Sequence, residues 1–241
     1  MLKNCLLIAG TDTDVGKTVV SSALIAYWRH YLATSRLSVI KLLQTGIGDR
    51  QWYEQFCDDQ VVVSTPLEFE QPVAPPVAAA AEGRVIDLGV VWQALQSLRQ
   101  TQDFVIAESL GSLGSPVTEE IVVADLAGEW RLPTILVVPV RLGSIGQAIA
   151  QVSLARERKV DLQGMILCCD TPDAAAQVEA LTPPLLLQRL TQLPVLGVMP
   201  FIEDFGDRQA LAQIVSSWKL EHFIPKDCLT YGQSDSLKAV S

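Results

Sequence analysis

The chain has 241 residues, 49% hydrophobic and 19% charged, which is enough to bury the core of one globular domain. Its net charge of −9 excludes non-specific binding to nucleic acid or to an anionic membrane, because both need a basic face. No stretch approaches the roughly 20 apolar residues of a membrane span, and the first residues do not resemble a signal peptide. The five cysteines are odd in number and lack metal-ligand spacing, so we expect reduced thiols in a cytoplasmic enzyme.

Six short apolar runs alternate with stretches of helical periodicity. The runs are mostly continuous rather than alternating, as in strands buried on both faces of a sheet. Helical periodicity between them, for example over residues 19–31 and 88–98, indicates repeated β–α units. We therefore predict an α/β fold with a parallel sheet and helices on both faces. The expected strands are residues 5–9, 37–42, 104–107, 135–140, 164–169 and 195–199.

This predicted domain spans residues 1–225 without an internal repeat or linker. The Pro-rich segment "PVAPPVAAAAEGR", residues 72–84, predicts the approach to a small helix rather than a domain boundary. From about residue 226 the chain is polar, so we expect a C-terminal tail over residues 226–241.

The segment between the first strand and the first helix has the pattern of a phosphate-binding loop. Its sequence, "GTDTDVGKT" from Gly10 to Thr18, is one residue longer between the glycines than the usual motif. Backbone N–H groups of such a loop surround a phosphate, while the lysine reaches the outer phosphates and the threonine hydroxyl is a ligand of Mg²⁺. The loop therefore predicts a phosphate-loop nucleotide-binding fold with Lys17 as a catalytic residue. The expected nucleotide-binding residues are Thr13, Asp14, Val15, Gly16, Lys17, Thr18 and Val19.

Three charged residues beyond the loop are candidates for the same site. Lys41 ends the second strand, where open α/β sheets bind ligands, although its ammonium group could equally reach solvent. Glu108 follows the third strand at the usual position of a Mg²⁺-binding carboxylate, with a helix-capping acid as the alternative. Asp49 follows a glycine-rich turn, where an aspartate is equally a turn former. Since Mg²⁺ prefers oxygen ligands, we predict a metal site made by Thr18, Asp49 and Glu108.

From Cys5 to about Asp207 the chain resembles the dethiobiotin synthetase family. The loop "GTDTDVGKT" is the most specific piece, because that family carries the same loop with Asp or Glu at the position of Asp14. Further segments that resemble the family are "KLLQTG", "LPTILVVPVRLGSIGQA" and "LGVMP".

The resemblance implies an ATP- and Mg²⁺-dependent ligase that forms carbon–nitrogen bonds. Its substrates would be 7,8-diaminononanoate and CO₂, which pass through a carbamate and a carbamic–phosphoric anhydride before a five-membered urea ring closes. Lys17 and Lys41 would bind the phosphate and the reacting groups, and Thr45 would contact the diamine. Gly111 would approach the nucleotide or the substrate closely, and backbone groups near Pro200 would contact the base. The resemblance also implies a homodimer.

The chain departs from the family pattern at several positions. Leu42 replaces a proline, and Ser109 and Ser112 replace two glycines of the family's E-G-A-G-G. Cys168 falls on the asparagine that reads the base. Because a thiol cannot make the paired contact of an amide with adenine, we expect weakened selectivity for the base.

Two other functions fit a phosphate loop on this fold. A partition or positioning ATPase with a deviant phosphate loop carries a second lysine where Asp12 stands here. An amide-forming ligase of cofactor synthesis usually has an additional glutamine-hydrolysing domain with a nucleophilic cysteine, and none of the five cysteines has such a setting. The sequence favours the dethiobiotin synthetase interpretation over both.

Overall fold

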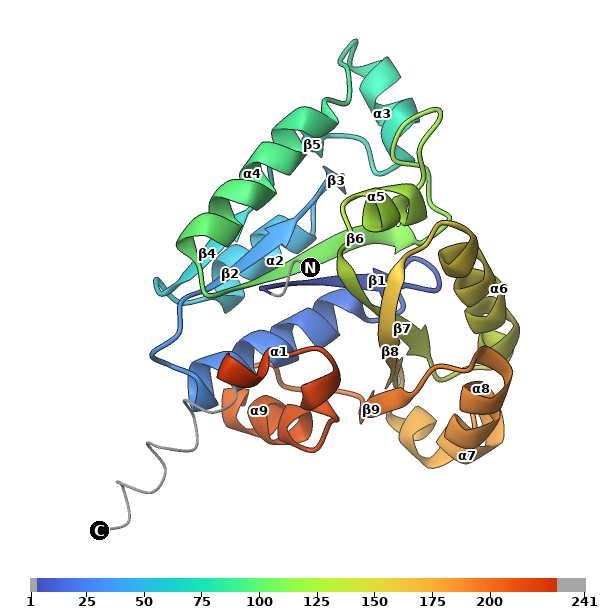
Figure 1. The fold of residues 1–241 in the computed structure, drawn as a ribbon. Helices are drawn as coiled ribbons and strands as arrows, with labels where there is room; N and C mark the ends of the chain where they lie inside the picture. Colours follow the sequence, from blue (N-terminus) through green and yellow to red (C-terminus); the bar gives the residue numbers. More distant parts are fainter. Residues whose placement is uncertain (1–3, 229–241) are drawn as a thin grey trace.

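A seven-stranded parallel sheet with strand order β4-β2-β6-β1-β7-β8-β9 forms the centre of the computed structural model, which describes residues 4–228 (Figure 1). A second, two-stranded sheet pairs β3 with β5 outside it. This architecture confirms the predicted α/β class with a parallel sheet. The strands are β1 (Cys5–Gly10), β2 (Leu37–Lys41), β3 (Gln44–Thr45), β4 (Val61–Ser64), β5 (Glu68–Phe69), β6 (Phe104–Ser112), β7 (Pro133–Pro139), β8 (Asp161–Cys168) and β9 (Val195–Met199).

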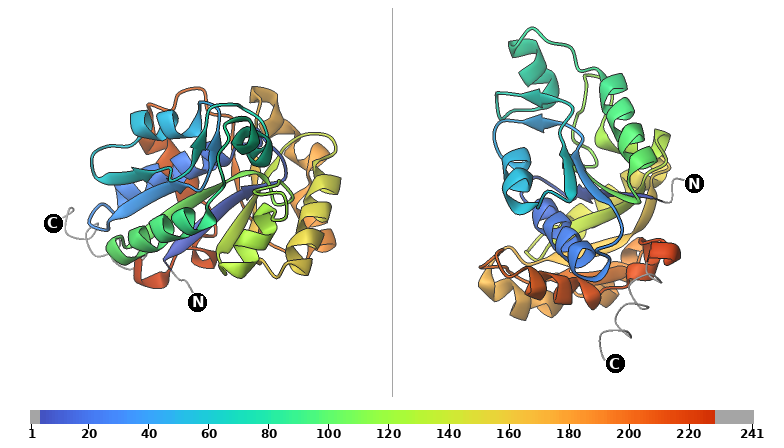
Figure 2. Two further views of the ribbon diagram at one scale, coloured as in Figure 1. Left: turned by 90° about the horizontal axis from the view of Figure 1, so that it is seen from above. Right: turned by 90° about the vertical axis from the view of Figure 1, so that its left-hand side faces the viewer.

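Helices cover both faces of the main sheet (Figure 1). One face packs against α1 (Lys17–Tyr31), α2 (Asp49–Phe56) and α9 (Arg208–Ser216), and Figure 2 shows α9 beside α1. The other face packs against helices from the middle of the chain. They are α3 (Pro75–Ala81), α4 (Leu88–Thr101), α5 (Val123–Glu129), α6 (Ser144–Glu157), α7 (Val178–Leu181) and α8 (Pro184–Thr191), the first of them the small helix predicted after the Pro-rich segment.

The double coverage explains why the strands are continuous apolar runs. Successive side chains of a strand point to opposite faces. In β1, Leu6 and Ile8 join the core on the α1 side, while Leu7 and Ala9 join the core on the α4 side. Each residue of the strand is buried, so neither face leaves room for polar side chains.

Two features of the sheet differ from the sequence prediction. Strand β4 was not predicted, because it is four residues long and lies at the edge of the sheet, where it pairs with β2 alone. Strand β6 continues to Ser112, five residues past its predicted end at residue 107, so Glu108 lies inside the strand rather than after it. Strand β6 lies between β1 and β2 and pairs with both. A register shift after Ile8 of β1 lets Gly10 pair with Ser112, so β6 continues to that residue.

Strand register brings the candidate residues to one edge of the sheet. Lys41 at the end of β2 pairs with Glu108 of β6, which also pairs with Ile8 of β1. Parallel strands end on the same side, so the phosphate loop after β1 opens beside Lys41 and Glu108.

No helix within residues 4–228 is long and apolar enough to cross a membrane. Of the predicted C-terminal tail, residues 229–241 lie outside the described part of the chain.

Candidate active site

The loop between β1 and α1 has the backbone geometry of a phosphate-binding loop. Gly16 has a φ of 93°, and a Cβ placed on it would lie 2.3 Å from Sγ of Cys168, so only glycine fits this position. Asp12 and Asp14 are exposed, whereas Val15 is buried. Oδ1 of Asp12 accepts a hydrogen bond from the backbone N–H of Thr13 at 2.8 Å, so this acidic side chain is held by the loop itself, and the exposed Asp14 lines the cavity.

Lys17 is the first residue of α1, and its side chain folds back over the loop. Its Nζ donates a hydrogen bond to the backbone carbonyl of Asp12 at 3.0 Å. Burial lowers the pKa of Lys17 to about 8, although the negative charge of Glu108 acts in the opposite direction. A buried ammonium group with one carbonyl partner is well placed to gain a phosphate oxygen as a second partner.

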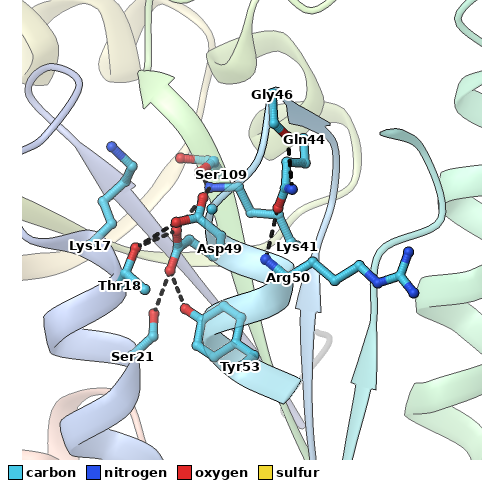
Figure 3. Close-up of polar contacts among 12 residues, drawn as sticks. Lys17, Thr18, Ser21, Lys41, Gln44, Gly46, Asp49, Arg50, Tyr53 and Ser109 are labelled. Atoms are coloured by element: carbon cyan, nitrogen blue, oxygen red, sulfur yellow. Dashed lines mark hydrogen bonds and ion pairs between the residues drawn. The ribbon is translucent and has the colours of Figure 1, made fainter. Parts of the chain in front are cut away.

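Lys41, Asp49 and Glu108 form an ionic cluster beside the loop, in which Lys41 and Glu108 are buried and the side chain of Asp49 is 31% exposed (Figure 3). Nζ of Lys41 lies 2.5 Å from Oδ2 of Asp49 and 2.8 Å from Oε1 of Glu108, and it also donates to the backbone carbonyl of Ser109 at 2.9 Å. Burial alone would lower the pKa of Lys41, but the charges of Glu108 and Asp49 outweigh burial and raise it. Since Lys41 is 4% exposed, its ammonium group faces these anions and not solvent.

Thr18 joins the two carboxylates from the side of the phosphate loop. Its Oγ1 lies 3.0 Å from Oδ1 of Asp49 and 3.1 Å from Oε1 of Glu108. Neighbouring oxygens around an octahedral Mg²⁺ ion with bonds of 2.0–2.1 Å are about 2.9 Å apart. The spacing and chemistry of this donor set therefore fit Mg²⁺. Within residues 4–228, no group of three or more His, Cys, Asp or Glu side chains could hold a metal; the predicted set consists of two carboxylates and the hydroxyl of Thr18.

A cavity of about 840 Å³ connects the loop with the ionic cluster. This volume is typical of a site for a nucleotide-sized ligand. Most of the residues predicted from the sequence meet in this cavity. Those that line it are Thr13, Asp14, Val15, Gly16, Lys17, Thr18, Val19, Lys41, Thr45, Asp49, Glu108 and Gly111.

Relatives of this chain carry one consistent name. The family described as "AAA domain" matches residues 4–209. The "ATP-dependent dethiobiotin synthetase BioD" of Gloeothece citriformis (strain PCC 7424) is 52% identical over 222 residues, covering 91% of this chain and 98% of that protein. The protein of the same name from Crocosphaera subtropica (strain ATCC 51142 / BH68) is 54% identical over 216 residues, covering 90% and 97%. The chain belongs to the dethiobiotin synthetase family.

Solved structures similar to this member of the dethiobiotin synthetase family confirm the phosphate-loop fold. A ParA family ATPase from Chlorobium tepidum TLS superposes with a TM-score of 0.53 at 12% identity, covering 94% of this chain and 98% of that one. The MinC:MinD cell division protein complex of Aquifex aeolicus superposes with a TM-score of 0.51 at 15% identity, covering 88% and 87%. Identities this low show a shared fold and nothing more specific.

The far end of the cavity, where the resemblance to the family places the base-reading position on Cys168, is largely apolar. Cys168 is buried against Gly16, and burial raises the pKa of its thiol to about 12. The cavity lining here includes Phe201 and Ile202 but not Pro200, among the residues that the structure describes. The predicted contact of backbone near Pro200 with the base stays a prediction. The other residues at this end are Cys169, Asp170 and Phe205.

Two residues that support the site were missed by the sequence analysis. Gln44 accepts a hydrogen bond from the backbone N–H of Arg50 at 2.8 Å and donates to the carbonyl of Gly46 at 3.0 Å, which holds the turn between Thr45 and Asp49 (Figure 3). Tyr53 donates its hydroxyl proton to Oε2 of Glu108. Burial, followed by the charge of Glu108, raises the pKa of Tyr53 well above its ordinary value.

A sequence signal existed for Tyr53 but not for Gln44. Asp49 and Tyr53 are four residues apart on α2, so a helix beginning at Asp49 places them on one face. The role of Gln44 depends on how a turn closes, which no periodic pattern encodes.

Proposed function

We infer that this site joins CO₂ to 7,8-diaminononanoate, and that the protein is accordingly an ATP-dependent dethiobiotin synthetase, a ligase that forms carbon–nitrogen bonds. The observation that carries this proposal is the identity of 52–54% with proteins of that name over nine-tenths of the chain. The geometry supports it, because the phosphate loop, two lysines and an oxygen donor set face one cavity.

The proposed reaction asks for little covalent chemistry from the protein. One amine of the diamine takes up CO₂, and an oxygen of the resulting carbamate attacks the γ-phosphate of ATP, with ADP as the leaving group. The second amine attacks the carbonyl of the carbamic–phosphoric anhydride, the ring closes and phosphate leaves. Because this last step is intramolecular, correct orientation of the bound diamine supplies much of the rate.

In this proposal Lys17 and Lys41 neutralise the charge that develops on the transferred phosphoryl group. The charges of Glu108 and Asp49 raise the pKa of Lys41 and favour its cationic form, which suits a charge stabiliser. Thr18, Asp49 and Glu108 would hold Mg²⁺, which supplies charge neutralisation at the phosphate oxygens. Thr45 lines the cavity, where it would contact the diamine, and Gly111 would allow the nucleotide to approach the backbone.

The proposal includes a homodimer in the cytoplasm. Helix α6 begins at Ser144 after the turn "RLG" without a side-chain cap, and Leu142 beside it is 88% exposed. The N-terminus of a helix attracts anions, so α6 is a candidate to hold the carboxylate of the diamine across a dimer interface. Light scattering on the active enzyme measures the oligomeric state, and an active monomer would contradict this part of the proposal.

One incubation tests the proposed activity. The protein is mixed with ATP, Mg²⁺, ¹³C-bicarbonate and the diamine, and mass spectrometry follows the product. We expect labelled dethiobiotin with wild-type protein and with Lys219→Ala, which changes an exposed lysine outside the cavity. Hydrolysis of ATP that is independent of the diamine and yields no dethiobiotin would instead favour a nucleotide-dependent switch.

A further inference from the structure

Glu108 has a hydrogen-bonding environment that the proposed metal site alone does not explain. Its carboxylate is fully buried and accepts four donors, which is the capacity of its two oxygens. Oε1 accepts from Thr18 at 3.1 Å and from Lys41 at 2.8 Å. Oε2 accepts from Ser21 at 3.1 Å and from Tyr53. The two oxygens are therefore in different surroundings.

The donors to Oε1 belong to the cavity, and the donors to Oε2 do not. Thr18 and Lys41 line the cavity, whereas Ser21 and Tyr53 are fully buried and are not part of its lining. Figure 3 shows the hydroxyl groups of Ser21 and Tyr53 pointing toward the same acceptor, which is Oε2 of Glu108. Neither hydroxyl can reach a ligand in the cavity, so Ser21 and Tyr53 can affect a ligand only through Glu108.

The two donors remove a rotation that the carboxylate would otherwise have. The last torsion of a glutamate side chain is broad, so a carboxylate held at one oxygen alone can turn and offer either oxygen, or both, to a cation. A rotation of the Glu108 carboxylate that brings neither oxygen to Ser21 and Tyr53 would break their hydrogen bonds to it, which is costly in the interior of a protein.

We propose that Tyr53 and Ser21 are positioning residues that hold Oε2 of Glu108 and so present Oε1 alone to Lys41 and to a divalent cation, which would replace the hydrogen bond from Thr18. This inference rests on the proposed function, because the cation belongs to that proposal. Partners of metal-binding side chains commonly orient their ligands in this way.

Helix α2 thereby sets the position of both carboxylates. Asp49 at its first turn supplies one carboxylate directly, and Tyr53 one turn later fixes the other. The helix is itself fastened to α1, because Nε1 of Trp52 donates to Oγ of Ser22 at 2.9 Å. Two adjacent serines of α1 therefore take part. Ser21 donates to Glu108, and Ser22 accepts the hydrogen bond from Trp52.

The test compares Tyr53→Phe, Ser21→Ala and the double variant with wild type. A matched control is Tyr27→Phe, which removes a hydroxyl from another largely buried tyrosine of the same core, outside the cavity. Binding of Mn²⁺ in the presence of ADP is titrated by electron paramagnetic resonance, which measures the metal without turnover. We expect the Kd for Mn²⁺ to rise about 10–100-fold in Tyr53→Phe and to stay unchanged in Tyr27→Phe.

A second measurement separates positioning from structural damage. If the variants only weaken the metal, high Mg²⁺ restores their kcat towards the wild-type value, whereas a damaged fold is not rescued by metal. Because both hydroxyls donate to one oxygen, we expect the Kd for Mn²⁺ to rise in the double variant by more than the product of the two single increases.

Each outcome decides a different question. Wild-type protein that binds no Mn²⁺ with ADP overturns the metal site of the proposed function and this inference with it. Wild-type binding together with an unchanged Kd in both single variants overturns the positioning role and leaves the proposed function intact. If Tyr53→Phe fails to fold, Ser21→Ala decides the matter, because it removes a donor from the same oxygen with a smaller change of volume.

Discussion

The two ends of the cavity are built in opposite ways. At one end, Lys41, Asp49 and Glu108 form a largely buried ionic cluster in which every charge has a partner of opposite sign. At the other end, Cys168 is buried against the phosphate loop beside the largely apolar residues Phe201 and Ile202. Under the proposed function, this difference predicts strict binding of the phosphate and its metal and loose contact with the base. The predictions below test that contrast, beginning with the largest expected effect.

Removal of either lysine at the ionic end should nearly abolish activity. We expect Lys17→Ala and Lys41→Ala each to lower turnover by at least about a hundredfold, as loss of one electrostatic stabiliser typically does. Lys219→Ala, at an exposed position, serves as the control, with kcat measured at saturating ATP and diamine. Normal turnover in Lys41→Ala would remove Lys41 from the reaction.

The two ends meet where Gly16 packs against Cys168, and an added methyl group there should disrupt nucleotide binding. Gly16→Ala combines a positive φ of 93° with a clash against Sγ, so we expect a loss of about 1–3 kcal/mol in the free energy of unfolding and weaker ATP binding. Gly83→Ala isolates the backbone strain, because Gly83 has a φ of 62° and open space at its Cβ.

Adding Cys168→Ala to Gly16→Ala refines this test. It removes the sulfur from the clash but leaves the strained φ, so part of the lost ATP affinity should return. Denaturation and ATP titration are measured for wild type, Gly16→Ala, Gly83→Ala and the double variant. The comparison separates the effect of the strained φ from that of the clash with Sγ of Cys168. Equal losses in Gly16→Ala and Gly83→Ala would show that the contact with Cys168 is unimportant.

Loose contact with the base should appear as weak nucleotide selectivity. A good paired contact to a base contributes roughly 1–3 kcal/mol of discrimination, and the thiol of Cys168 cannot make one. We therefore expect GTP and CTP to support turnover within about tenfold to a hundredfold of ATP, measured as kcat/KM at matched Mg²⁺. A preference for ATP above a thousandfold would mean that another residue reads the base.

The smallest expected effect concerns the reactivity of Cys168. Alkylation needs the thiolate, and a pKa of about 12 leaves about a thousandfold less thiolate at pH 8 than in an ordinary exposed cysteine. We expect iodoacetamide to leave Cys168 unmodified under conditions that alkylate glutathione, with a rate that keeps rising as the pH approaches 12. Peptide mapping by mass spectrometry measures the modification, and rapid labelling at pH 8 would show that this end of the cavity opens.

The sequence by itself determined the parts of the site that lie within one local pattern. The apolar run before Gly10, the spacing to Lys17 and the helix that follows identify the phosphate loop, because strand, loop and helix are adjacent in the chain. The same patterns predicted the α/β class and the position of Lys41 at the end of β2. The resemblance to the dethiobiotin synthetase family was also visible in these motifs, and the relatives confirm it.

Tertiary structure alone decided how these pieces act together. Whether Lys41 faced solvent or an anion was open until the order of strands placed β2 beside β6 and brought it to Glu108, 67 residues away in the sequence. The pairing of Tyr53 with Glu108 and of Gly16 with Cys168 likewise depends on how distant elements pack. Periodicity reports which face of an element is buried, but the partner that buries it is set by strand order and register, which no local pattern contains.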